Sequence, residues 1–248
     1  MEQPKAAVLF DLGNTLVRYW ERHEFPGLLR SGIAAVRGYV DEQGLLRVPA
    51  EVMWRNVEAE DHGTPDHRVR PLEGRLVRIF DLDAAICTES LLETMCALFL
   101  APMFARGSLY EDAIPTLEAA RAKGLRTAIV SNAPWGSPAK LWRAEVARLG
   151  LSEHADVVVF CSEAGWRKPA RQIFEYTLER LQVKPGQCVF VGDDPRWDLV
   201  GPRALGMQAV LIDRWGTLQD SPEPAISSLS ELCDRVDWRL LGLSSGRS

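Results

Sequence analysis

Polar side chains that can bind a metal ion or a phosphate group follow four short apolar runs of the chain. Asp11 follows AAVLF, and Ser131 follows LRTAIV. Lys168 comes a short loop after DVVVF, while Asp193 and Asp198 come after CVFVG. Carboxylate oxygens, completed by a backbone carbonyl and water, suit Mg²⁺ rather than zinc or copper. A carboxylate beside Mg²⁺ and a lysine can attack a phosphate, because the two cations offset the repulsion between like charges.

The apolar runs in front of these residues are predicted strands of one parallel sheet. Each run is continuous rather than alternating, as expected for strands that helices cover on both faces. Ligands bind at the carboxyl ends of the strands in open parallel sheets, so the polar residues should meet at one edge. The predicted strands are 6–10, 125–130, 156–160, 188–192 and 208–212, with helices near 138–149, 169–182 and 195–205 and a last strand and helix in 225–236.

Between residues 16 and 107 the strand-like runs disappear and helical patterns replace them. Candidate helices lie around 28–43, 49–60, 71–80 and 89–105. We therefore predict an α/β fold with a Rossmann-like parallel-sheet core and an all-helical cap domain. The core would comprise residues 1–15 and 108–240, the cap residues 16–107, and a tail residues 241–248. Segments 18–25 and 106–110 would act as hinges between the two domains.

The polar sites, taken in order, resemble the haloacid dehalogenase superfamily of aspartate-nucleophile hydrolases. The pattern of that superfamily is D-x-D-x-T, then S/T, then K, then G-D-x-x-x-D. The matching text here is FDLGNTL, IVSNAP, GWRKP and VGDDPRWDLVGPRALGM. The resemblance covers the first strand and about 120 residues of the second half of the chain. It implies a hydrolase with Mg²⁺ as its cofactor.

The resemblance also implies a role for each matching residue. Asp11 would be the nucleophile that forms an aspartyl-phosphate, and Ser131 would hydrogen-bond the phosphoryl oxygens. Lys168 would neutralise the negative charge of Asp11 and of the phosphoryl group. Asp193 would hold Mg²⁺, and Asp198 would position Lys168 or the waters of the metal. The implied metal ligands are Asp11, the carbonyl of Gly13, Asp193 and Asp198, and the implied substrate-binding residues are Asn14, Thr15 and Asn132.

Gly13 departs from the pattern, because phosphatases of the superfamily carry there a second aspartate that acts as general acid and base. The carbonyl of Gly13 can still reach the metal, but no carboxyl is left to protonate the leaving oxygen. General-acid help is worth about 10²–10⁴-fold in rate. We therefore expect a preference for leaving groups of low pKa, such as aryl, acyl or anomeric sugar phosphates. Glu21, His23 or Glu24 could instead swing in with the helical segment as the acid.

Three functions fit these residues. The first is Mg²⁺-dependent hydrolysis of a small phosphorylated metabolite. The second is hydrolysis of a carbon–halogen bond, which uses an aspartate nucleophile and needs no acid for the halide. That reaction needs no Mg²⁺, so Asp193, Asp194 and Asp198 would have no metal ion to bind, which counts against it. In the third, Gly13 marks an impaired site in a protein that binds phosphorylated ligands without turning them over.

Tryptophans stand beside the loops of the predicted site. Trp135, Trp166 and Trp197 flank three of these loops, and Trp20 lies at the first hinge. They could form an aromatic wall for a ring-bearing leaving group, or they could pack the loops against the helical segment. Of the two interpretations we favour packing.

Composition excludes several other classes of protein. The 29 basic and 34 acidic side chains of the 248 residues give a net charge of −5, so no positive field attracts nucleic acid or anionic membranes. The start of the chain is unlike a secretory signal, and the apolar run at 97–105 is too short to cross a bilayer. Five irregularly spaced cysteines are typical of reduced thiols. We predict a cytoplasmic protein whose partner is a small phosphorylated molecule; the sequence predicts no oligomeric state.

Overall fold

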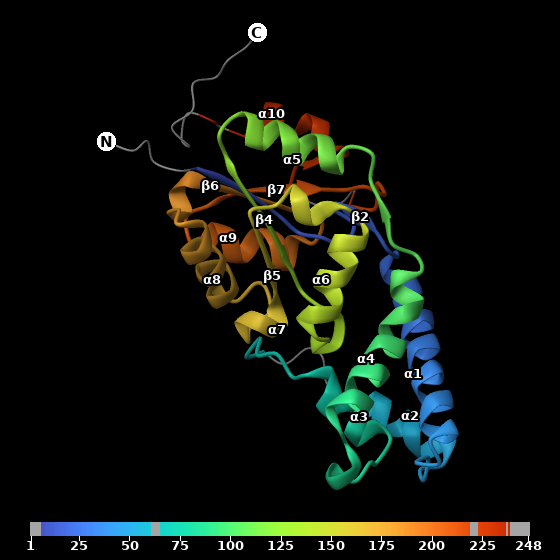
Figure 1. Ribbon diagram of the computed structural model, residues 1–248. Helices are drawn as coiled ribbons and strands as arrows, with labels where there is room; N and C mark the ends of the chain where they lie inside the picture. The colour runs from blue at the N-terminus through green and yellow to red at the C-terminus, as the bar shows by residue number, and fades with distance from the viewer. Residues whose placement is uncertain (1–5, 61–64, 219–222, 237, 239–248) are drawn as a thin grey trace.

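The computed structural model describes residues 6–60, 65–218, 223–236 and 238, and is built around one parallel sheet (Figure 1). Its strand order is β5-β4-β1-β6-β7-β8, and every neighbouring pair is parallel. The strands are β1 (Ala7–Phe10), β4 (Arg126–Ser131), β5 (Val157–Phe160), β6 (Cys188–Gly192), β7 (Gln208–Ile212) and β8 (Ala225–Ile226). The predicted α/β class and parallel sheet are confirmed, while the predicted tail at 241–248 lies outside the described residues.

β1 lies at the centre of the sheet, between the two strands that deliver the other polar groups. Phe10 is in register with Ile129 of β4 and with Val191 of β6. The strand order therefore changes direction at β1, and a crevice forms at the carboxyl ends of the strands where it does so. The backbone N–H of Asp11 donates to the carbonyl of Val191 at 2.8 Å, which places Asp11 in that crevice.

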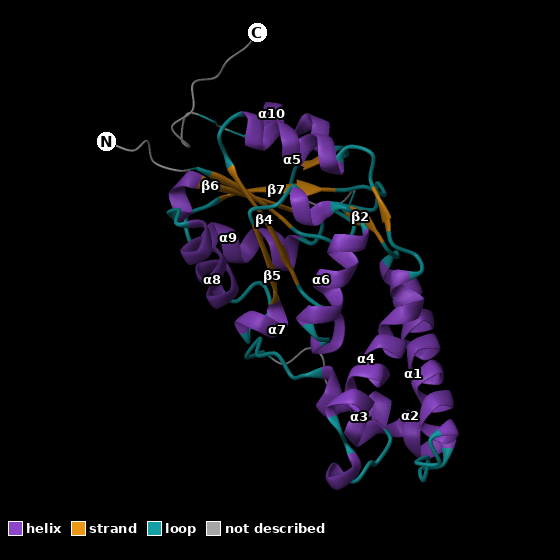
Figure 2. Ribbon diagram, in the orientation of Figure 1, coloured by secondary structure: helices purple, strands orange, loops and turns teal. Residues whose placement is uncertain are grey.

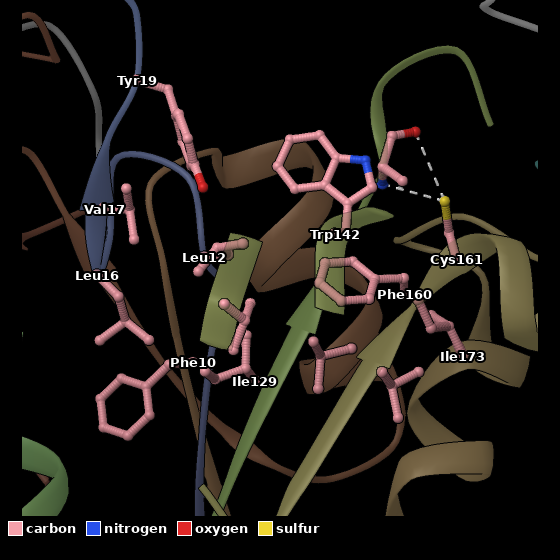
Figure 3. Close-up of a cluster of buried hydrophobic side chains, with 14 of the residues drawn as sticks. Phe10, Leu12, Leu16, Val17, Tyr19, Ile129, Trp142, Phe160, Cys161 and Ile173 are labelled. Atoms are coloured by element: carbon pink, nitrogen blue, oxygen red, sulfur yellow. Dashed lines mark hydrogen bonds between the residues drawn. The ribbon is translucent and has the colours of Figure 1, made fainter. Parts of the chain in front are cut away.

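Helices cover both faces of the sheet, which explains why its strands read as continuous apolar runs. Every residue of β1 and β6 is buried. Helices α5 and α10 lie on one face, and α8 and α9 lie on the other (Figure 1). Figure 3 shows side chains of β1, β4 and β5 packed with those of neighbouring helices in one apolar core. The helices are α5 (Ala113–Ala122), α6 (Ala139–Arg148), α7 (Cys161–Ala164), α8 (Arg171–Leu181), α9 (Val200–Ala204) and α10 (Leu232–Arg235).

The segment between the first strand and α5 contains only helices and loops in its described residues, apart from a short strand at each end (Figure 2). Those strands, β2 (Val17–Arg18) and β3 (Ser108–Leu109), pair antiparallel, so the chain enters and leaves the segment at one place. α1 and α4 pack so closely that a Cβ on Gly32 would lie 2.5 Å from the carbonyl oxygen of Phe99. The helices are α1 (Phe25–Glu42), α2 (Ala50–Ala59), α3 (Leu72–Ile79) and α4 (Glu89–Phe104).

The largest differences from the sequence-based expectation are in two helical regions of the core. α5 was not predicted, because Pro115 obscures it; proline is tolerated there because it lies in the first turn. The helix predicted at 195–205 is instead a π-helical turn, Pro195–Leu199, followed by the short α9. Such turns are frequent at functional sites. This one carries Asp198.

Among the described residues, no helix combines the length and apolar character that a membrane span requires.

Candidate active site

Three carboxylates meet at the carboxyl ends of β1 and β6. Oxygens of Asp11, Asp193 and Asp198 lie within 4.8 Å of one another. Asp11 comes from the end of β1, Asp193 from the end of β6, and Asp198 from the π-helical turn. Asp11 and Asp198 are buried, so little water is present to screen their charges. The sequence placed these residues at one edge of the sheet, and the structure brings their side chains together.

Lys168 joins this cluster from the loop after α7. Its Nζ lies 2.6 Å from Oδ1 of Asp11 and 2.7 Å from Oδ1 of Asp198. Burial by itself would lower the pKa of Lys168, but the two carboxylates raise it above its usual value, so the ammonium stays charged. One ammonium neutralises only one of the three carboxylates.

Burial and the excess negative charge together change the pKa values of the other two carboxyls. Burial, together with the carboxylates of Asp11 and Asp198, raises the pKa of Asp193 well above its usual value. Burial also raises the pKa of Asp198 to about 6, even though Lys168 opposes that rise. Protons or a divalent cation must offset the excess charge at neutral pH. An all-oxygen donor set with two negative charges in excess fits a hard cation such as Mg²⁺.

Neighbouring backbone and amide groups hold the cluster in place. Oδ2 of Asp198 accepts a hydrogen bond from the backbone N–H of Asp194 at 3.0 Å. A Cβ on Gly192 would lie 2.3 Å from the carboxyl carbon of Asp198, so only glycine leaves room for that carboxylate. The side chain of Asn132 accepts from the N–H of Lys168 at 2.8 Å and donates to its carbonyl at 3.2 Å. Asn132 therefore clamps the lysine loop, while Ser131 lines the cleft beside it.

Asn14 and Thr15 shape the loop that follows Asp11. Asn14 adopts a left-handed conformation, with φ of 56°, which asparagine tolerates better than most residues. Its side-chain amide donates to the carbonyl of Trp20 at 3.1 Å and to Asp193 at 3.4 Å. The hydroxyl of Thr15 is buried without a partner in the described part of the chain, and its carbonyl accepts from Arg214 at 2.7 Å. These contacts stabilise the loop and keep Asp193 next to it.

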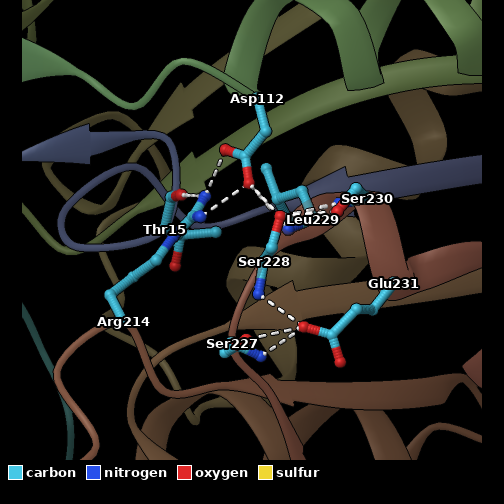
Figure 4. A network of polar contacts seen from close by, with 8 residues as sticks. All are labelled: Thr15, Asp112, Arg214, Ser227, Ser228, Leu229, Ser230 and Glu231. Atoms are coloured by element: carbon cyan, nitrogen blue, oxygen red, sulfur yellow. Dashed lines mark hydrogen bonds and ion pairs between the residues drawn. The ribbon is translucent and has the colours of Figure 1, made fainter.

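Figure 4 shows the network that anchors this loop to two distant segments. Arg214 binds Thr15 and forms two hydrogen bonds of 2.7 Å with the carboxylate of Asp112, at the start of α5. Asp112 also accepts from the hydroxyl of Ser228 at 2.7 Å and from the N–H of Leu229 at 2.9 Å. Asp112 and Arg214 are not among the residues that the sequence predicts for the site. No local pattern reveals them, since they lie 102 residues apart.

A cleft of about 840 Å³ opens over the carboxylates. Trp20 and Trp197 line it, as an aromatic wall would require, and so do Trp142 and Trp215, which the sequence analysis did not single out. The other two tryptophans of the predicted set, Trp135 and Trp166, pack outside the cleft. The ring of Trp135 lies 5.6 Å from that of Phe99 in α4, and Arg68 stacks on Trp166 at 4.5 Å.

The sequence model of the haloacid dehalogenase-like hydrolase family matches residues 5–206, which is most of the chain. The chain belongs to this family. The membership that the motifs predict is thereby confirmed.

Relatives of this hydrolase include both phosphatases and dehalogenases. It is 30% identical over 213 residues to the ribulose-1,5-bisphosphate 5-phosphatase of Halopiger xanaduensis, and the match covers 84% of each chain. It is 31% identical over 190 residues to (S)-2-haloacid dehalogenase 1 of a Pseudomonas species, which covers 73% of this chain and 79% of that one. The crystal structure of a HAD phosphatase from Thermococcus onnurineus has a TM-score of 0.63 at 28% identity, over 94% of this chain and 98% of that one.

In this HAD-like hydrolase, the carboxylate of Asp194 pairs with arginines and is not one of the three clustered carboxylates. Its carboxylate accepts hydrogen bonds from Arg196 at 2.9 Å and from Arg22 at 2.7 Å. Burial opposes the effect, but these arginines hold the pKa of Asp194 below its usual value. Arginines thus offset the charge of Asp194, whereas the three clustered carboxylates share one lysine.

Mg²⁺ should raise the midpoint of thermal unfolding more at about pH 8 than at about pH 5. Folding favours the protonated carboxyl of Asp198, whose pKa is raised to about 6. This stabilisation of the metal-free protein is complete below the usual carboxyl pKa and is lost as the pH rises through about 6. Mg²⁺ competes with these protons. Asp193→Asn should show little Mg²⁺ effect at either pH, and equal effects on the wild-type protein would contradict the prediction.

Proposed function

We propose that this hydrolase is a Mg²⁺-dependent phosphomonoesterase that acts on a small phosphorylated metabolite through an aspartyl-phosphate. The observation that carries the proposal is the charge of the cluster: three carboxylates share one lysine at the carboxyl edge of the sheet. A bound Mg²⁺ would be held by Asp11, Asp193, Asp198 and the carbonyl of Gly13. Its charge would offset the repulsion between Asp11 and a phosphate dianion.

The residues of the chain divide the remaining work. A carboxylate oxygen of Asp11 attacks phosphorus, and the leaving oxygen departs with the electron pair of its bond. Lys168, which touches Asp11, stabilises the negative charge that develops on the phosphoryl group. Ser131 donates a hydrogen bond to a phosphoryl oxygen, and Asn132 keeps Lys168 in place. Asn14 and Thr15 maintain the loop that presents Asp11 to the substrate.

The helices α1–α4 would form a cap over the cleft, with the paired strands β2 and β3 as its base. Trp20 and Phe25, at the start of this segment, line the cleft, so movement of the segment would change the shape of the cleft. Closure of the cap would exclude water from the reacting phosphate. We place the cap at residues 16–107 and the core at residues 1–15 and 108–240.

Hydrolysis of carbon–halogen bonds is the second candidate. The Pseudomonas relative is named a haloacid dehalogenase, and Gly13 provides no acid, which a departing halide does not need. The three clustered carboxylates argue against it, because without a metal their excess negative charge would have to be offset by protons on Asp193 and Asp198. A protein that only binds phosphorylated ligands is less well supported, since Asp11 and Lys168 are both present and in contact.

EDTA should abolish the hydrolysis of p-nitrophenyl phosphate, and Mg²⁺ added in excess should restore it. The reason is that the cluster cannot accept a phosphate dianion while its own negative charge is uncompensated. The measurement is release of p-nitrophenol, with release of chloride from 2-chloropropionate measured in parallel. Chloride release that persists in EDTA, without phosphatase activity, would support the dehalogenase instead. No turnover of any ester or haloacid would support the binding protein.

A further inference from the structure

Two side chains of the first hinge line the cleft and lie close to each other. Nδ1 of His23 is 3.6 Å from Oε2 of Glu21, and both residues border the cleft that contains Asp11. They belong to the short 3₁₀ turn, Arg22–Glu24, and to the residue before it. The side chain of His23 is 76% exposed, so a ligand in the cleft can reach it.

Contacts on both sides hold this turn at the cleft. Nη2 of Arg22 lies 2.7 Å from Oδ2 of Asp194, the residue that follows the proposed metal ligand Asp193. Glu24 forms an ion pair with Arg106, from the second hinge, and accepts a hydrogen bond of 2.8 Å from the N–H of Glu21. The turn is thereby tied to the core and to the far end of the helical segment. His23 lies between these two attachments.

The proposed reaction needs a proton donor, and position 13 lacks one. Among the cleft-lining residues within the described ranges, most groups that could carry a proton are already held in ion pairs or hydrogen bonds. Lys168 is held by two carboxylates, and arginines keep Asp194 charged. The carboxylate of Asp213 accepts backbone N–H bonds from its own loop, at 3.0 Å and 2.8 Å. None of these three can protonate a leaving oxygen and then recover the proton.

Tyr19 is a poor alternative. Burial, with the neighbouring Glu145, raises the pKa of Tyr19, which makes its hydroxyl a weaker acid. That hydroxyl also lies 3.4 Å from Oε1 of Glu145, which accepts its hydrogen bond. Asp193 and Asp198 also line the cleft, but they are the proposed metal ligands, which leaves Glu21 and His23 as candidates. Histidine is the side chain suited to both giving and taking a proton near neutral pH.

We propose that His23, oriented by Glu21, is the general acid and base that replaces the absent carboxyl at position 13. This inference rests on the proposed phosphatase function. As Asp11 bonds to phosphorus, the bond to the leaving oxygen breaks, and that oxygen takes a proton from the imidazolium of His23. The neutral imidazole then takes a proton from water as the water attacks phosphorus, and the electron pair of the broken bond returns to Asp11.

Charged groups on several segments lie in or next to the turn that carries His23. Replacing any of these groups would change the electrostatic potential at His23, so the test substitutes His23 itself. Glu21 and Glu24 interact with His23 directly, while Arg106 pairs with Glu24 and Arg22 pairs with Asp194.

The test compares His23→Gln with wild-type protein on two substrates, glycerol phosphate and p-nitrophenyl phosphate, with Mg²⁺ present. For glycerol phosphate, whose leaving oxygen needs a proton, kcat/KM should fall about 10²-fold. For p-nitrophenyl phosphate the loss should stay below about tenfold, because nitrophenolate leaves without one. The wild-type rate on glycerol phosphate should fall with rising pH as the proton donor is lost, and the variant should lack this fall.

A matched control is available in a second histidine that pairs with a glutamate away from the cleft. Nδ1 of His154 lies 3.5 Å from Oε1 of Glu118, and neither residue lines the cleft. His154→Gln should keep the wild-type ratio between the two substrates. Equal losses on both esters in His23→Gln, or an unchanged pH profile, would overturn the inference and leave the phosphatase proposal standing. Absence of any ester hydrolysis by wild-type protein would overturn both.

Discussion

Asp11→Asn should lower kcat for every phosphate ester by at least about 10³-fold, the scale of loss on removing a nucleophile. An amide oxygen does not attack phosphorus, so no aspartyl-phosphate forms. The substitution also removes a charge that raises the pKa of Asp193, so this carboxyl should ionise more readily than in the wild-type protein. Lys168 keeps Asp198 as a partner at 2.7 Å, and we expect the variant to fold.

Turnover of p-nitrophenyl phosphate measures this effect, with thermal unfolding recorded to establish that the variant is folded. Asp41→Asn is the matched control, because Asp41 is exposed near the end of α1 and lies away from the cleft. It should retain wild-type activity. If Asp11→Asn kept more than about a hundredth of the wild-type rate, the covalent mechanism would be wrong.

The second large effect is on the choice of leaving group. Wild-type kcat/KM should be at least about 10²-fold higher for p-nitrophenyl phosphate than for glycerol phosphate, because position 13 has no carboxyl to protonate an alkoxide. Gly13→Asp should narrow this gap by raising turnover of glycerol phosphate about 10–10²-fold. The site has room for the change: a Cβ on Gly13 would meet only Tyr19 Cδ2, at an ordinary contact distance of 3.8 Å.

Gly13→Ala is the control for this substitution, since it adds the Cβ without the carboxyl. It should leave the gap between the two esters as wide as in the wild-type protein. The measurement is kcat/KM for both esters in all three proteins. Similar values for the two esters in the wild-type protein would show that the absent carboxyl does not limit the reaction.

The gap is the ratio of kcat/KM for p-nitrophenyl phosphate to kcat/KM for glycerol phosphate. Substitutions at residues 13 and 23 should change this ratio in opposite directions. An exposed imidazole on a hinge is a less enclosed donor than a carboxyl beside the nucleophile, so His23 leaves part of the gap open. Gly13→Asp should therefore give the smallest gap, wild-type protein an intermediate one, and His23→Gln the largest. A double variant should resemble Gly13→Asp, because the new carboxyl makes the imidazole redundant.

The sequence predicted the sheet and the order of the polar loops because both are local signals. A strand covered on both faces must be apolar throughout, and the residue after it must lie at the edge of the sheet. That reasoning located Asp11, Ser131 and Asp193 without any knowledge of their partners. It failed at 195–205, where the choice between an α-helix and a π-helical turn depends on bonds from Asp194 and Asp198 rather than on apolar spacing.

The contacts of each side chain become visible only in the tertiary structure, because they join segments that are distant in the sequence. Asn132, a substrate-binding residue by resemblance, holds the backbone of Lys168 36 residues away. Arg214 reaches Thr15 across 199 residues. Glu21, His23 and Glu24 were all candidate acids from the sequence, and only the position of the hinge at the cleft distinguishes Glu21 and His23, which line it, from Glu24. Local apolar patterning, in short, determines elements and their order, whereas contacts between distant segments depend on how those elements pack.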